Sequence, residues 1–95
     1  MQITKQMNNG QLTLILSGEL TLFNLNVVRQ ELISALNDGN KVAIDLKDVN
    51  ECDTAGIQLV ISAKKTSIAE NREVTIVNPH ASVLSAAERI GVDFQ

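Results

Sequence analysis

The sequence of 95 residues contains no tryptophan or tyrosine, and its only aromatic residues are Phe23 and Phe94. It therefore lacks the aromatic side chains on which single-strand nucleic-acid binders stack bases. Its net charge of -3 argues in the same direction, because binding to phosphates needs clustered Lys and Arg that this sequence does not have. Nucleic acid is therefore not expected as a partner.

Cysteine and histidine are also scarce, with one residue of each, Cys52 and His80. A single cysteine excludes a disulfide framework, and one Cys with one His cannot make the usual ligand set of a zinc site. Neither of the glycine motifs that bind phosphates, G-x-x-x-x-G-K-[ST] and G-x-G-x-x-G, occurs. We therefore expect no metal, no cofactor and no enzymatic activity.

Titratable residues that could suggest chemistry have simpler interpretations. The acidic pair Asp45 and Asp48 is interpreted as solvated loop charge. His80 follows a proline between a strand and a helix, and is interpreted as a surface residue. Cys52 is interpreted as structural, because the acidic side chains of Glu51 and Asp53 oppose formation of a thiolate.

Long hydrophobic runs are missing as well. No stretch approaches the roughly 20 apolar residues of a membrane span, and the N-terminus lacks the apolar core of a signal peptide. Apolar residues make up 44% of the chain and charged residues 20%, as in folded soluble proteins. The sequence predicts one domain over residues 1–95, in the cytoplasm, without direct membrane insertion.

The spacing of the apolar residues predicts seven elements in the order β-β-α-β-α-β-α. A strand, a helix and a second strand form a βαβ unit, in which the strands are parallel. The fold class is therefore α/β, with a four-stranded mixed sheet and helices mainly on one face. The expected strands are 3–7, 11–16, 41–46 and 73–77, the expected helices are 22–36, 54–70 and a last one after Pro79, and 47–52 is expected as a polar connection.

A polar turn at residues 51–54 leads into the helix that starts near Thr54. Asp53 and Thr54 both carry side-chain oxygens suited to capping a helix, which places a hydroxyl at the positive end of a helix dipole. Gly56 leaves the backbone beside this hydroxyl uncovered. The apolar residues of this helix occupy more than half of its circumference, which predicts either a partner for part of that surface or deep burial in the domain.

Three pieces of the sequence together resemble a known family, the STAS domains of bacterial anti-sigma factor antagonists and their relatives. The first piece is Asp53-Thr54-Ala55-Gly56-Ile57-Gln58-Leu59, preceded by the strand Ile44-Asp45-Leu46. The second is the strand end Ser17-Gly18-Glu19-Leu20, and the third is Val77-Asn78-Pro79 with the helix that follows. The resemblance covers essentially the whole chain.

The resemblance implies a binding module that is switched by phosphorylation at Thr54. The expected partner is an anti-sigma factor that is also a serine/threonine kinase, or another signalling protein, with a phosphatase as a possible second partner. A phosphate adds roughly 1.5 to 2 negative charges, which a helix N-terminus tolerates but which would repel an acidic partner or clash in a dry interface. The partner-binding residues implied are Gly18, Leu20, Thr21, Asp53, Thr54, Ala55, Gly56, Ile57 and Gln58.

Two alternatives accompany this interpretation. The Asp-Thr-Ala-Gly form followed by Ile-Gln-Leu, with Leu20-Thr21 upstream, resembles STAS proteins associated with chemotaxis and those of ABC-type lipid transport systems. In the transport systems the domain binds an ATPase subunit, and Thr54 serves at the interface without being phosphorylated. A third hypothesis is binding of a nucleotide or another small ligand by the domain itself.

Overall fold

The computed structural model describes residues 1–38, 41–69 and 73–92, and the side chains within these ranges except those of 66–69. The strands are β1 (Gln2–Asn8), β2 (Gln11–Leu20), β3 (Lys41–Cys52) and β4 (Val74–Val77). The helices are the short 3-10 turn η1 (Leu22–Asn24), α1 (Leu25–Asn37), α2 (Thr54–Ala69) and α3 (Ala81–Arg89). The expected C-terminal end of α2, at residue 70, lies outside the described residues.

The four strands form one mixed sheet in the order β1-β2-β3-β4. β1 pairs with β2 antiparallel through a tight turn, in which Asn9 and Gly10 both have positive φ. β3 pairs parallel with β2 on one side and with β4 on the other. This arrangement confirms the expected fold class.

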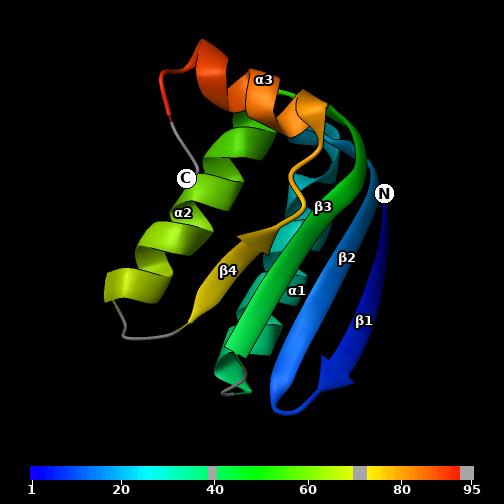
Figure 1. Cartoon of the computed structure of the whole chain (residues 1–95), viewed down its shortest axis with the longest axis vertical. Coiled ribbons are helices and arrows are strands. Elements are labelled where there is room, and N and C mark those ends of the chain that lie inside the picture. Colours follow the sequence, from blue (N-terminus) through cyan, green and yellow to red (C-terminus); the bar gives the residue numbers. More distant parts are fainter. Residues whose placement is uncertain (39–40, 70–72, 93–95) are drawn as a thin grey trace.

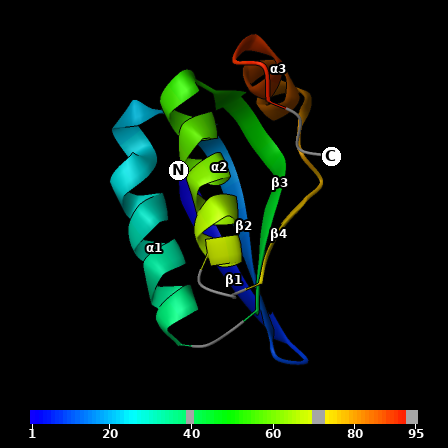
Figure 2. The same cartoon turned by 90° about the vertical axis from the view of Figure 1, so that its left-hand side faces the viewer.

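Helices α1 and α2 lie side by side on one face of the sheet (Figures 1 and 2). Leu14 and Ile44 are neighbours in register on β2 and β3, and both are 1% exposed. The core continues into the predicted stripe of α1, where Val28, Leu32, Ala35 and Leu36 are buried. Helical spacing therefore places one face of α1 on the sheet, as the sequence predicts.

The wide apolar band of helix α2 is buried inside the domain. Ile57 is 0% exposed, Val60 2% and Ala63 8%, and Ile61 is half-buried against the same core. Of the two explanations offered by the sequence, deep burial therefore accounts for the apolar surface of α2. The described side chains of this helix leave no wide apolar face exposed. In α3 the predicted stripe is only partly buried, since Leu84 is 42% exposed.

The polar segment 47–52 is strand and not the predicted connection. β3 continues to Cys52 beside a β2 that continues to Leu20, with two shifts of register near Ser17 and Gly18. Along this extension Val49 and Cys52 are buried while the residues between them are exposed. The exposed polar side chains hid the strand from sequence analysis, because strand pairing satisfies the backbone whatever the outward side chains are.

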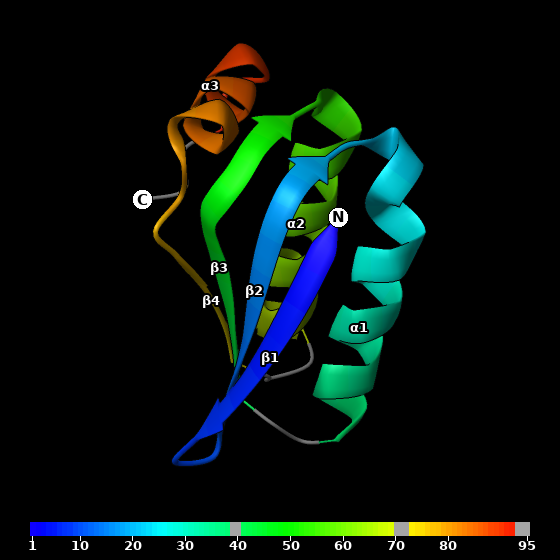
Figure 3. The same cartoon turned by 90° about the vertical axis from the view of Figure 1, so that its right-hand side faces the viewer.

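Helix α3 covers the part of β3 that lies beyond the end of β4. The Ser82 hydroxyl donates to the Val49 carbonyl at 2.6 Å, and an Arg89 guanidinium nitrogen donates to the Cys52 carbonyl at 3.3 Å. The ends of β2 and β3 and the N-terminal ends of α1 and α2 gather at this end of the molecule (Figure 3). No helix within the described residues is long and apolar enough to cross a membrane.

Candidate protein-interaction surface

Asp53 joins β3 to α2 and caps the first turn of the helix. One carboxylate oxygen accepts from the Gly56 backbone N–H at 2.7 Å. The other accepts from the Leu22 backbone N–H at 2.9 Å, which ties η1 to the start of α2 across 31 residues of sequence. The predicted capping role belongs to Asp53 alone, and Thr54 is the first helical residue.

Gly56 lies against the end of β2. A Cβ added to Gly56 would stand 2.1 Å from the Leu20 carbonyl oxygen, far inside any permitted contact. The Asp53 N–H donates to the same carbonyl at 3.2 Å. The fold itself therefore requires glycine at position 56, because the chain's own strand occupies the space of a side chain, and a part for Gly56 in partner binding stays a prediction.

The Thr54 side chain is exposed and makes no hydrogen bond with the described residues. It stands on the first turn of α2, where the backbone N–H groups carry partial positive charge. Gly56 N–H and Ile57 N–H are bonded to Asp53, whereas no acceptor is found for the N–H groups of Thr54 and Ala55 in the described part of the chain. The hydroxyl is therefore open to solvent beside two free donors.

The remaining predicted partner-binding residues divide by burial. The side chains of Leu20 and Ile57 are fully buried, Gly56 is buried, and Thr21 is 8% exposed with no hydrogen-bond partner found for its hydroxyl among the described residues. These four can shape the surface but present almost none of it. Exposed positions are Thr54 and Gln58, and half-buried ones are Gly18, Asp53 and Ala55.

Gly18 lies inside β2, at an irregularity in its pairing with β3, and not in an open loop. Its φ of +113° is a conformation that L side chains rarely adopt, and it lies beside a register shift between β2 and β3. A Cβ at this position would approach Met1 at an ordinary contact distance of 3.6 Å. Glycine is therefore needed at position 18 for its backbone conformation and not for lack of space.

Two residues that sequence analysis did not select stand out at the same end. Leu22 is 65% exposed and Phe23 94% exposed, on the turn η1 that is bonded to Asp53. The sequence predicted a helix from Leu22, whereas α1 begins at Leu25. A signal was present, because Phe23 falls outside the predicted apolar stripe of that helix.

Cys52, His80 and Asp45, which sequence analysis interpreted as having no chemical role, differ in burial and in their hydrogen bonds. Burial, and next the charge of Asp53, raise the pKa of Cys52 to about 11, so the thiol stays neutral, as its structural interpretation requires. His80 is exposed and caps α3 by accepting from the Ser82 N–H. Asp45 is 7% exposed and accepts from the Lys47 N–H, which corrects its assignment to a solvated loop. No cluster of metal-ligand type occurs in the part of the chain that the structure describes.

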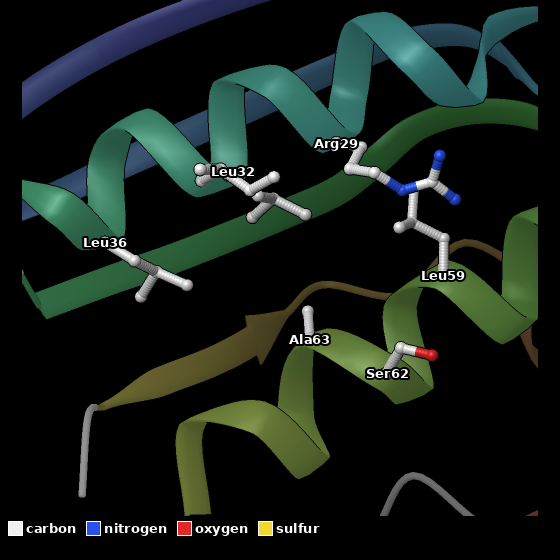
Figure 4. Close-up of a pocket in the computed structure, with 7 residues that line it drawn as sticks. Arg29, Leu32, Leu36, Leu59, Ser62 and Ala63 are labelled. Atoms are coloured by element: carbon white, nitrogen blue, oxygen red, sulfur yellow. The ribbon is translucent and has the colours of Figure 1, made fainter. Parts of the chain in front are cut away.

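An open groove of about 210 Å³ lies between α1 and α2. Figure 4 shows Leu32 and Leu36 of α1 facing Ala63 of α2, with Arg29 over Leu59 at one end. Four of the five apolar lining residues are between 5% and 9% exposed, and only Ile33, at 52%, lies mostly in solvent. The floor is therefore the ordinary contact between two packed helices. The groove lies along the helices, away from the first turn of α2.

A family model described as "Mlab, STAS domain" matches residues 3–94. The chain belongs to the STAS family. The resemblance inferred from residues 53–59 and the strand order is thereby confirmed. No curated protein matches the chain significantly.

Solved structures share the fold of this STAS domain at low sequence identity. The unphosphorylated anti-sigma factor antagonist SpoIIAA is 17% identical, with a TM-score of 0.71, over 96% of this chain and 84% of that one. A variant of RsbS from Moorella thermoacetica is 10% identical, with a TM-score of 0.76, over 98% and 80%. The protein Mglu matches at 18% identity and a TM-score of 0.71 over 82% of this chain, which spans only 20% of the length of Mglu.

Proposed function

We propose that this STAS domain is a non-enzymatic module that binds a protein partner through the first turn of α2, and that phosphorylation of Thr54 switches this binding. The observation that carries the proposal is the exposed Thr54 hydroxyl, which bonds to none of the described residues and lies at a helix N-terminus whose cap is already supplied by Asp53. A modification there removes no contact that the fold needs. The similarity to an anti-sigma factor antagonist adds support for a partner of the anti-sigma factor and kinase type.

The proposed switch acts in a dry contact. Asp53 already occupies the Gly56 and Leu22 donors, and the N–H groups of Thr54 and Ala55 can satisfy only part of a phosphate. A partner that covers Thr54 must then strip water from a group with roughly two negative charges, and burial of an incompletely paired charge is costly. Phosphorylation therefore weakens binding while the fold remains intact.

The test has a chemical and a binding part. Mass spectrometry of the protein from its native cells should show a phosphorylated form, with fragmentation assigning the phosphate to Thr54. Thr54→Ala should keep partner binding and lose the modification, whereas Thr54→Asp should weaken binding. Partner affinity that is equal for Thr54→Asp and the wild type would contradict the switch.

A second candidate function is that of a constitutive subunit of an ABC-type lipid transport system or of a chemotaxis complex. It is favoured by the residues Asp53-Thr54-Ala55-Gly56, which resemble the STAS domains of those systems. The same first turn of α2 would then bind an ATPase subunit or a signalling protein with Thr54 unmodified. An unmodified Thr54 in every growth condition, together with stable capture of such a subunit, would favour this candidate.

A further inference from the structure

The turn η1 presents the two most exposed large apolar side chains of the described residues, Leu22 at 65% and Phe23 at 94%. Exposed apolar residues are common singly, but adjacent ones beside a candidate site mark an interaction surface. Aromatic residues are also frequent among the few that dominate binding energy at interfaces. Neither side chain belongs to the buried core of the described residues.

The backbone that carries them is nevertheless held firmly. The Leu22 N–H donates to Asp53 at 2.9 Å, the Asn24 side-chain amide donates to the Glu19 carbonyl at 2.7 Å, and the Asn24 N–H donates to the Thr21 carbonyl at 2.9 Å. Thr21, which precedes the turn, is buried. A turn fixed in this way presents its side chains at little further entropic cost on binding.

The charges next to the turn indicate which charge the partner surface carries. Glu19 and Glu51 are register partners on β2 and β3, and both are exposed. Neither lies within ion-pair distance of a cation in the described residues, where the ion pairs are Lys5 with Glu31 and Lys41 with Glu73. Like charges opposite each other on adjacent strands destabilise a sheet, and a cationic side chain from outside would relieve the repulsion.

A second copy of this chain does not supply that cation. A two-fold contact through the turn would bring two further glutamates to the same place, on a chain of net charge -3. The charge pattern therefore favours a different protein over self-association.

We propose that Leu22 and Phe23 insert into an apolar pocket of the partner protein, and that Lys or Arg side chains on the rim of this pocket face Glu19 and Glu51. The inference rests on the proposed function only in that this end of the domain binds a protein. It adds the anchor residues and the chemistry of the partner surface. The first turn of α2, with Thr54, then lies beside the anchor and becomes dry on binding.

Photo-crosslinking in the native cells tests the placement. A photoreactive phenylalanine analogue replaces Phe23, Gln58 or Met7 in turn. Position 58 reports on the proposed function, and position 7 is a control that is 58% exposed and lies near the β1–β2 turn at the opposite end of the sheet. The expected result is one adduct with the same partner from positions 23 and 58 and none from position 7.

Each other pattern has a distinct meaning. An adduct from position 58 alone would overturn the anchor and leave the proposed function standing. An adduct from position 23 alone would support the anchor and contradict binding centred on α2. Adducts from neither position would overturn both, and an adduct with a second copy of this chain would overturn the choice of partner.

Affinity for the purified partner tests the energetics. Phe23→Ala should weaken binding about 30-fold, as truncation of a dominant interface residue does, while Met7→Ala binds as the wild type. Both positions are exposed, so equal melting temperatures serve as the folding control. The double variant Glu19→Gln with Glu51→Gln should bind more slowly and with a weaker dependence on salt. Wild-type affinity of Phe23→Ala, or an unchanged salt dependence of the double variant, would overturn the proposal.

Discussion

Two helices of this domain, α2 and α3, follow neighbouring parallel strands and begin with capped first turns that carry a hydroxyl. In α2 the cap is Asp53 and the hydroxyl of Thr54 is open to solvent. In α3 the cap is His80, and the hydroxyl of Ser82 donates to the Val49 carbonyl at 2.6 Å. One hydroxyl is exposed, and the other holds α3 on the sheet.

The two caps differ in reach as well as in residue type. Among the described residues, the side chain of His80 bonds only to Ser82, two positions away, whereas the side chain of Asp53 bonds both to its own helix and to Leu22. The first turn of α2 is therefore a junction between segments that are distant in sequence. In α3 the cap is local, and the contact with a distant segment is made by the Ser82 hydroxyl.

The largest effect is expected from a substitution that adds a side chain where α2 packs closely against β2. Gly56→Ala places a methyl group 2.1 Å from the backbone oxygen of Leu20, and since backbone cannot give way cheaply we expect a loss of about 3 kcal/mol or more in unfolding free energy. Urea denaturation measures this loss. The matched control is Gly91→Ala just after α3, which meets no atom within 4 Å and costs about 1 kcal/mol for its positive φ. Equal losses would show that the junction has no special packing requirement.

A smaller effect should separate the two caps. Asp53→Ala removes an acceptor from both Gly56 and Leu22, for a loss of about 2 to 3 kcal/mol, because hydrogen bonds to charged groups are the stronger ones. His80→Ala removes one local cap, for a loss of about 1 kcal/mol. Thermal unfolding gives both values, and amide hydrogen exchange at Leu22 should accelerate only in Asp53→Ala. Unchanged exchange at Leu22 would contradict the role of Asp53 as a junction.

The smallest effects are expected from removing the two hydroxyls themselves. Ser82→Ala leaves the Val49 carbonyl without its donor and should cost about 1 kcal/mol. Thr54→Ala removes a side chain with no hydrogen bond to the described residues and should change stability by less than about 0.5 kcal/mol. Parallel urea titrations of the two variants compare them. A larger loss for Thr54→Ala than for Ser82→Ala would reverse the contrast between the two helices.

Sequence periodicity was sufficient for the order of the elements and for most of the core. It failed along 47–52, where two exposed polar residues precede each buried one, because the backbone pairing that makes β3 long depends on a partner strand. It also predicted one continuous helix from Leu22, where the structure has the 3-10 turn η1 followed by α1. That residue is held in η1 by a bond to Asp53, and no local pattern reveals a contact across 31 residues.

The sequence by itself determined that a capped helix begins near Thr54, since short-range hydrogen bonds of residues such as Asp53 need only the next few positions of the chain. Only the tertiary structure decided which residues of the candidate surface are reachable. Leu20 and Ile57 are buried there, Gly56 faces its own strand, and Phe23 is fully presented. The physical reason is that exposure depends on which distant segment lies against a side chain.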